Sequence, residues 1–247
     1  MARENLRTKT ARLQKIVARL KQAYPDAHCE LDHTNPLELL VATILSAQAT
    51  DAGVNKVTPA LFAKFPDASA LAGAPAEHVE QLIHSTGFFR QKAKSLMGMS
   101  RALVERHGGE VPRTMDALVK LPGVGRKTAN VVLGHALGVP GLPVDRHVLR
   151  VSNRLGIADS DDPDRVEQQL TGALPPGLWT RASDTLILHG RRICKPEPLC
   201  GQCAAAEACE FYAEASGLSA PVPPPPARRR KATTARPART PAASRRR

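Results

Sequence analysis

Apolar residues recur along most of the chain at the spacing of an α-helix. Leu13, Ile16, Val17 and Leu20 lie three or four positions apart, so they share one face of a helix. Periodicity with capping and breaking residues predicts further helices over residues 35–47, 89–107, 114–120, 125–137, 145–155, 164–173 and 179–190. No segment alternates apolar and polar residues between hairpin turns, so no strand is predicted. The pattern predicts an all-α protein.

The ends of these helices are marked by specific residues. Asn35-Pro36 supplies an N-cap followed by proline at the first helical position, and Gly108-Gly109 ends the helix that starts near residue 89. Thr114 and Asp145 are predicted N-caps, and Gly156 ends the helix that Asp145 opens.

Composition supports a helical core. The chain has 247 residues, which suffice for one large domain or two small ones. Hydrophobic residues make up 42% and aromatic residues only 3%. The core is therefore built mainly of Leu, Val, Ile and Ala, which suits packed helices better than sheets.

The positive charge is concentrated at the C-terminus. Residues 217–247 contain nine basic residues and no acidic one, so residues 1–216 carry only +3 of the formal net charge of +12. With their high content of Pro, Ala and Arg, residues 217–247 are predicted to be a disordered basic tail. Such a tail favours a polyanionic partner, above all nucleic acid.

No segment predicts export or membrane insertion. Residues 1–10 are charged and lack an apolar stretch, and the best apolar run, residues 37–47, is too short to span a bilayer. We therefore expect a soluble, intracellular protein. A cytoplasmic bacterial protein associated with the nucleoid is favoured, and the Arg-rich tail would also serve as a nuclear import signal. In that compartment cysteines are reduced, so clustered cysteines indicate a metal site rather than disulfides.

Residues 121–130 (LPGVGRKTAN) predict a tight hairpin between two helices. Gly123 and Gly125 permit unusual backbone angles and close approach, and the next helix presents unpaired amides that suit a phosphate. Together with Arg126, this hairpin is expected to hold a DNA backbone without reading its sequence. On the glycines alone, a plain connection between two helices is equally compatible.

Lys127 and Asp145 are the candidate catalytic residues. Lys127 falls in the first helical turn beside Arg126, and both the helix dipole and the neighbouring charge favour its neutral, nucleophilic form. From the residues alone, a phosphate contact or a solvated lysine is the more common role. Asp145 at a helix N-terminus is either a simple N-cap or an ionised carboxylate that takes part in chemistry.

Four cysteines lie close together near the end of the helical region. Cys194, Cys200, Cys203 and Cys209 have the spacing C-x5-C-x2-C-x5-C, which predicts a metal site. This spacing alone does not decide between zinc and an iron–sulfur cluster. Cys29 is isolated and is predicted to be a buried apolar residue.

Several motifs, taken in order, resemble the endonuclease III family, the bifunctional branch of the helix-hairpin-helix DNA glycosylases. The similarity runs from about residue 10 to residue 212 and is carried by residues 45–51 (LSAQATD), 121–133 (LPGVGRKTANVVL), 144–148 (VDRHV), 186–191 (LILHGR) and the four cysteines.

The resemblance implies two helical lobes with a DNA cleft between them. Residues 29–139 would form a six-helix barrel with the hairpin, and residues 1–28 together with 140–212 would form an iron–sulfur lobe. It also implies a structural [4Fe-4S] cluster on the four cysteines, a monomer, and oxidised pyrimidines in double-stranded DNA as substrates.

The resemblance also assigns roles to individual residues. Lys127 matches the family's nucleophilic lysine and Asp145 its catalytic aspartate. Gln48 matches the glutamine that fills the gap left by the extruded nucleotide. Phe88 falls where the family places an apolar wedge, although a core residue at a helix start is the alternative. His147 is expected either to contact a phosphate or to cap or pack.

Three features depart from the family pattern. The first cysteine spacing is x5 rather than x6. That loop, residues 195–199, has one Lys and one Glu, which puts its usual role as a basic DNA contact in doubt. Arg146 replaces the common threonine after the aspartate, and the basic tail lies outside the family core.

The alternative functions are a mismatch or pyrimidine-dimer glycosylase on the same fold and a non-catalytic DNA-binding protein. Lys127 argues against a monofunctional glycosylase.

Overall fold

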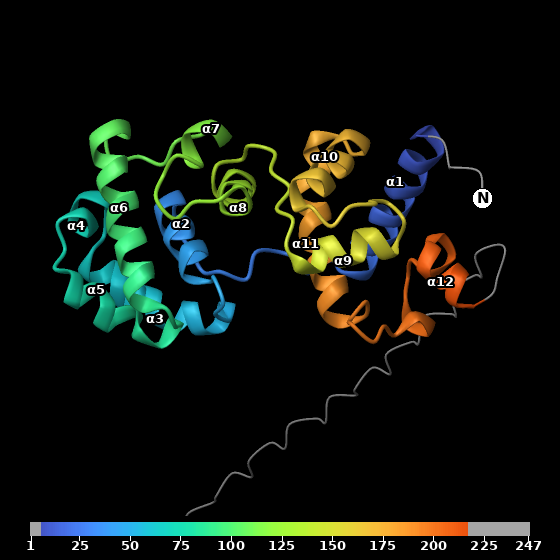
Figure 1. Ribbon diagram of the computed structural model, residues 1–247, viewed down its shortest axis with the longest axis horizontal. Coiled ribbons are helices and arrows are strands. Elements are labelled where there is room, and N and C mark those ends of the chain that lie inside the picture. The colour runs from blue at the N-terminus through green and yellow to red at the C-terminus, as the bar shows by residue number, and fades with distance from the viewer. Residues whose placement is uncertain (1–5, 217–247) are drawn as a thin grey trace, which may run out of the picture.

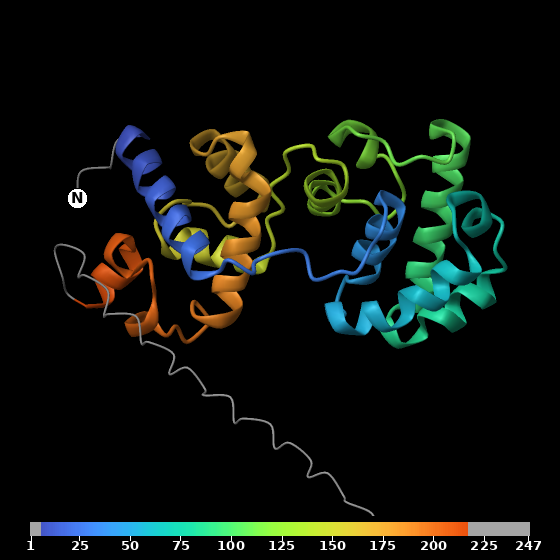
Figure 2. The ribbon, with the colours of Figure 1, turned by 180° about the vertical axis from the view of Figure 1, so that it is seen from behind.

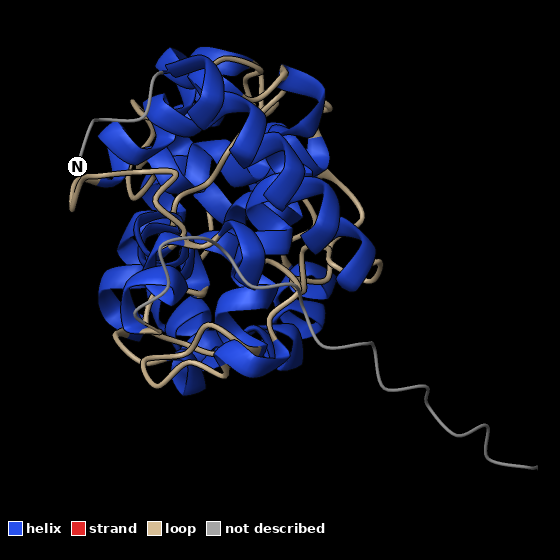
Figure 3. Ribbon diagram, turned by 90° about the vertical axis from the view of Figure 1, so that its right-hand side faces the viewer, coloured by secondary structure: helices blue, strands red, loops and turns tan. Residues whose placement is uncertain are grey.

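The computed structural model describes residues 6–216, and within this range every regular element is a helix (Figure 3). The all-α prediction is therefore confirmed. The α-helices are α1 (Leu6–Ala23), α2 (Pro36–Leu45), α3 (Asp51–Lys64), α4 (Ala68–Ala72), α5 (Ala76–Ile83), α6 (Phe89–His107), α7 (Met115–Leu118), α8 (Arg126–Ala136), α9 (Arg146–Arg154), α10 (Pro163–Ala173), α11 (Trp179–Arg192) and α12 (Glu210–Ala215). Short 3-10 helices are η1 (His84–Thr86), η2 (Pro176–Leu178), η3 (Cys200–Gln202) and η4 (Ala206–Ala208).

The helices are grouped around two separate hydrophobic cores. Figures 1 and 2 show α2–α8 on one side and α1 with α9–α12 on the other. One core is built from residues between Leu31 and Leu137, and the other from residues 13–27 and 142–209. Only the segments that join α1 to α2 and α8 to α9 pass between the two groups (Figure 1). We therefore propose that residues 29–139 form one lobe and residues 6–28 with 140–212 the other; residues 1–5 of the predicted second lobe lie outside the described residues.

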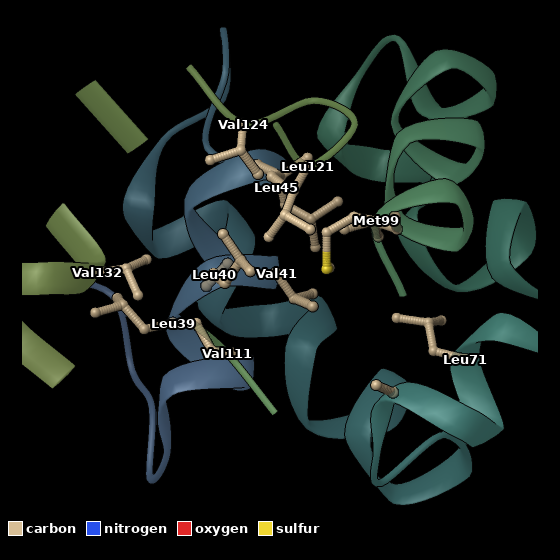
Figure 4. Close-up of a cluster of buried hydrophobic side chains, with 14 of the residues drawn as sticks. Leu39, Leu40, Val41, Leu45, Leu71, Met99, Val111, Leu121, Val124 and Val132 are labelled. Atoms are coloured by element: carbon tan, nitrogen blue, oxygen red, sulfur yellow. The ribbon is translucent and has the colours of Figure 1, made fainter. Parts of the chain in front are cut away.

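Helix α2 is the centre of the first core. Its residues 39–45 are all buried, as expected of a helix that is apolar on every side. Figure 4 shows Leu40 and Leu45 of this helix in the same buried cluster as Met99 of α6 and the hairpin residue Val124. The core therefore fixes the hairpin and the C-terminal end of α2 against the same helix, α6.

The predicted helix ends were largely correct. Asn35 caps α2 by accepting a hydrogen bond from the amide of Glu38, and α6 ends at Gly108 in the left-handed conformation. Two predicted helices are shorter than expected, because α2 ends at Leu45 and α7 at Leu118. No helix of residues 6–216 is long and apolar enough to cross a membrane. The predicted disordered tail, residues 217–247, lies outside the described residues.

Candidate functional site

A pocket of about 130 Å³ lies where the two lobes meet, and both Lys127 and Asp145 line it. The first lobe contributes residues of α2, α3 and α8 to its wall, and the second lobe contributes α11 and the start of α9. Lys127 and Asp145, the two catalytic residues predicted from the sequence, thus line one pocket. Lys127 comes from α8 of the first lobe, and Asp145 comes from the start of α9 in the second lobe.

Lys127 is held by the hairpin in the first turn of α8. Gly125 is the N-cap of that helix and has open space where a Cβ would lie. Gly123 has a φ of 77°, and a Cβ there would come within 2.7 Å of the Ser95 side chain. Gly123 is therefore required both by its backbone angle and by the close packing of the hairpin on α6.

Asp145 caps α9 with one carboxylate oxygen. Its Oδ1 accepts hydrogen bonds from the amides of His147 and Val148, both at 2.8 Å. Among residues 6–216, Oδ2 has no hydrogen-bond partner. The cap fixes the carboxylate at the edge of the pocket and leaves one oxygen for other interactions.

The other charged groups around the pocket are paired with one another. Arg191 binds Glu30 at 2.6 Å and Asp51 at 3.0 Å, and the Arg192 guanidinium lies 2.9 Å from Asp26. The Asp184 carboxylate lies 3.2 Å from His135 Nε2. Within the described part of the chain, Lys127 and Asp145 form no ion pair. They are the lysine and the carboxylate of this pocket that remain available to a bound molecule.

Arg126, predicted to contact DNA, has a protein partner. Its guanidinium binds Glu167 of α10 through two hydrogen bonds of 2.8 and 2.7 Å. Asn130 of α8 donates to the same carboxylate at 2.9 Å, and its own side-chain oxygen accepts from the amide of Leu142. Glu167 is buried, and it ties the helix that carries Lys127 to the second lobe. The contact of Arg126 with DNA stays a prediction.

We expect Glu167→Ala to lower the free energy of unfolding by about 1–3 kcal/mol, because it removes three hydrogen bonds to partly buried donors. Activity should also fall, since α8 loses its link to the second lobe. Chemical denaturation and single-turnover rates measure both effects. Asp164→Asn is the matched control: its carboxylate is exposed and lies 3.9 Å from the same arginine. Equal stability of the Glu167→Ala and Asp164→Asn variants would contradict this role.

Gln48 and Phe88 share an unusual backbone conformation. They are the two non-glycine residues with positive φ in the described part of the chain, at 55° and 47°. Such angles cost free energy and often mark functional sites. Both residues are exposed, Phe88 to 67%. The neighbouring Phe89 packs against the ring of His84 instead, so Phe88 is not a core residue at the helix start.

His147 lies half-buried on α9 between two arginines. Arg150 donates to its Nδ1 at 3.1 Å, and burial lowers the pKa of the imidazole. A Cβ on Gly190 of α11 would lie 2.9 Å from the His147 Cβ, so the ring is closely packed against that helix. A contact of His147 with a phosphate stays a prediction. Arg146, beside it, is exposed.

The four clustered cysteines surround one cavity. Cys194, Cys200, Cys203 and Cys209 all line a pocket enclosed by α11, η3 and η4. Among residues 6–216, no three His, Cys, Asp or Glu side chains lie close enough together to hold a single metal ion.

Polar groups surround the sulfur atoms of this pocket. His189 Nε2 lies 3.6 Å from the Cys203 Sγ, and the phenol of Tyr24 lies 2.9 Å from the other ring nitrogen. Burial lowers the pKa of His189 to about 4 and raises the pKa of Cys203 to about 12. Arg154 donates to the carbonyl of Pro196 at 2.8 Å and reaches the Cys194 Sγ at 3.7 Å. It thereby holds the shortened x5 loop.

Sequence reasoning missed the paired groups around the pocket. Arg191, Glu30 and Asp51 come from three distant segments, and nothing in their local sequence indicates that they meet. It also missed Lys92, a buried lysine between the segments that carry Gln48 and Phe88. A lysine at an otherwise apolar helix position was the available signal, because lysine is rarely buried without a partner.

Comparison with known proteins agrees with this architecture. The family model described as "HhH-GPD superfamily base excision DNA repair protein" matches residues 41–176. Endonuclease III of Synechocystis sp. is 52% identical over 204 residues, which cover 82% of this chain and 93% of the relative. Endonuclease III of Escherichia coli is 41% identical over 204 residues, covering 82% of this chain and 96% of the relative.

Solved structures give the same result. A structure of a trapped endonuclease III–DNA covalent intermediate has a TM-score of 0.79 and 43% identity, covering 84% of this chain and 98% of that chain. A thermostable thymine-DNA glycosylase has a TM-score of 0.74 at 24% identity and supports the fold alone. The matched region includes the hairpin, Lys127 and Asp145. The chain therefore belongs to the endonuclease III family, within the HhH-GPD superfamily of base excision DNA repair proteins.

Proposed function

We propose that this protein is a bifunctional DNA glycosylase and AP lyase that removes oxidised pyrimidines from double-stranded DNA. The observation that carries the proposal is the pocket between the lobes. Among its described residues, Lys127 and Asp145 form no ion pair, whereas the other charged side chains of the pocket are paired with one another. The endonuclease III relatives and the likeness to a trapped endonuclease III–DNA covalent intermediate support the same activity.

DNA binding would use three exposed features of the first lobe. The amides of the hairpin around Gly123 and Gly125 would hold a phosphate, aided by the positive end of α8. Gln48 and Phe88 would enter the base stack while the damaged nucleotide turns outward into the pocket. Extrusion costs a few kcal/mol and costs least for a base that stacks poorly, which favours damaged bases.

The chemistry requires a neutral amine at Lys127. Asp145 would help to remove its proton and would stabilise positive charge that develops on the sugar. The Lys127 Nζ would form a bond to C1′, and the base would leave with the bonding electron pair and a proton. Opening of the sugar ring gives an imine. Loss of a proton from C2′ then expels the 3′ phosphate by β-elimination, and hydrolysis of the imine restores the lysine.

We infer that the four cysteines hold a [4Fe-4S] cluster. All four line one cavity, and thiolates are the ligands that iron–sulfur clusters take in proteins. The resemblance of the chain to the endonuclease III family favours this cluster over a zinc ion. The cluster would stabilise the segment after α11, which contains little regular structure. His189 and Arg154 would contact its sulfur ligands and tune their basicity.

Purified protein is expected to be yellow-brown and to contain about four irons per chain, because four cysteine thiolates hold such a cluster. Metal analysis by mass spectrometry with absorption spectroscopy measures this. Cys29→Ser is the matched control, since Cys29 lies apart from the cluster pocket and should keep full iron content. One zinc and no iron would contradict the assignment.

The proposed activity is tested on two duplexes, one with thymine glycol and one with a preformed abasic site. We expect base release from the first and strand cleavage 3′ to the site in both. A mismatch glycosylase would release the base without cleaving the strand, and a pyrimidine-dimer enzyme would act on a cyclobutane dimer instead. A DNA-binding protein without catalytic activity would leave both duplexes intact.

A further inference from the structure

Lys92 of α6 is a buried lysine without a carboxylate partner. Its side chain is only 6% exposed, and no ion pair of residues 6–216 includes it. Its ammonium donates to the carbonyl of Leu45 at 2.8 Å and to the carbonyl of Thr86 at 2.7 Å. Burying an ammonium is costly, and burial lowers the pKa of Lys92. Burying a leucine or methionine side chain at this position would cost less free energy than burying an ammonium group. The presence of a lysine with two hydrogen bonds to carbonyls therefore requires an explanation.

The two carbonyls belong to the ends of two different helices. Leu45 is the last residue of α2, and Thr86 is the last residue of η1. Carbonyls at a helix C-terminus lack partners within the helix and favour a cation. The Ala49 amide, which would bond Leu45 in a longer helix, instead bonds the carbonyl of Ser46. Lys92 therefore satisfies a carbonyl that the end of α2 leaves free.

Each of these ends leads directly into one of the two strained residues. Gln48 lies three positions after Leu45, and Phe88 lies two positions after Thr86. The backbone amide of Lys92 also donates to the carbonyl of Phe88 at 3.0 Å. That backbone bond belongs to the first turn of α6 and would form with any residue at this position. The ammonium of Lys92 is what joins the segment that precedes Phe88 to the segment that precedes Gln48.

We propose that Lys92 is a positioning residue that fixes the Gln48 and Phe88 segments relative to each other, so that both side chains enter the DNA together during nucleotide extrusion. This inference rests on the proposed function. The two left-handed backbones are less stable than ordinary ones, and the surrounding structure must hold them. Without the ammonium the segments lose their common anchor, and extrusion should suffer more than the chemistry that follows it.

Two single-turnover rates separate extrusion from chemistry. Base release from a thymine glycol duplex requires a paired, stacked nucleotide to leave the helix, whereas strand cleavage at a preformed abasic site has no base to unstack. We expect Lys92→Met to lower the first rate about tenfold more than the second, which corresponds to about 1.4 kcal/mol. Lys92→Arg keeps the charge and the donors and should restore most of the ratio.

A matched control excludes a general loss of stability. Leu103→Ala removes a fully buried side chain from the same helix, about three turns after Lys92, so it should leave the ratio of the two rates unchanged. As a second readout, 2-aminopurine next to the lesion brightens when it unstacks, and its signal at saturating protein should be smaller with Lys92→Met. If Lys92→Met does not fold, Lys92→Gln replaces it in the test, since glutamine is neutral but still donates hydrogen bonds. Lys92→Gln should lower the ratio of base release to abasic-site cleavage several-fold.

The outcomes separate the two proposals. Wild-type protein that acts on neither duplex would refute the proposed function. Active wild-type protein with an unchanged rate ratio and an unchanged fluorescence signal in Lys92→Met, or in Lys92→Gln if the first variant does not fold, would refute the positioning role of Lys92 alone.

Discussion

Lys127→Gln is expected to lower both base release and strand cleavage by more than about 10³-fold. Lysine supplies the amine that bonds to C1′, and glutamine has no nucleophilic nitrogen to replace it. The fold should be retained, because Lys127 is exposed in the first turn of α8 and makes no ion pair in the described part of the chain. Rates on thymine glycol and abasic duplexes measure the loss.

Binding and a second lysine provide the controls for Lys127→Gln. The affinity of the variant for an abasic duplex should stay within about tenfold of wild type, or about 1.4 kcal/mol, since one charge is lost and the other contacts remain. Lys21→Gln removes an exposed lysine from the last turn of α1, outside the pocket, and should keep full activity. A Lys127→Gln variant that retains a tenth or more of the wild-type rate would show that another group attacks the sugar.

Asp145→Asn is expected to lower the rate of base release by about 10²- to 10⁴-fold while the protein keeps its stability. Asparagine caps a helix about as well as aspartate, so its side-chain oxygen can still accept from the amides of His147 and Val148. The substitution therefore removes the charge and leaves the cap. Single-turnover rates and a melting temperature separate the two contributions.

Asp67→Asn is the matched control for this substitution. Asp67 caps α4 in the same way, with its Oδ1 accepting from the amide of Ala70 at 2.7 Å, but it lies outside the pocket. Neither activity nor stability should change there. If Asp145→Asn were also fully active, Asp145 would be only a cap and the proposed acid–base role would be lost.

The sequence predicted the helices that have clear caps and a regular apolar face. Helix α6 ends where Gly108 indicates, and Asn35 and Thr114 cap the helices that they were predicted to cap. The sequence pattern did not predict the separate helices α3, α4 and α5 between residues 51 and 83. Gly53 and Pro59 both lie inside α3, and each weakens the helical pattern on which the prediction depends. Helices α4 and α5 are too short for a clear period.

The candidate site was predictable where its residues lie within recognisable motifs. Lys127 and Asp145 are such residues, and the structure places both at one pocket. The partners that hold these motifs in place were not predictable, because they come from remote segments. Glu167 reaches Arg126 across the lobes, and Lys92 reaches two helix ends at once. Such contacts depend on how remote segments pack in three dimensions, and the spacing of residues in one sequence does not indicate which segments meet.

The most direct test of the proposed chemistry is to locate the covalent bond itself. Wild-type protein is incubated with an abasic duplex and sodium borohydride, which reduces an imine to a stable amine. The adduct is then digested, and the modified peptide is identified by mass spectrometry. We expect a single modified residue, Lys127, in the peptide that follows the hairpin. An adduct on another amine, or no adduct from protein that still cleaves the duplex, would contradict the role of Lys127 as the nucleophile.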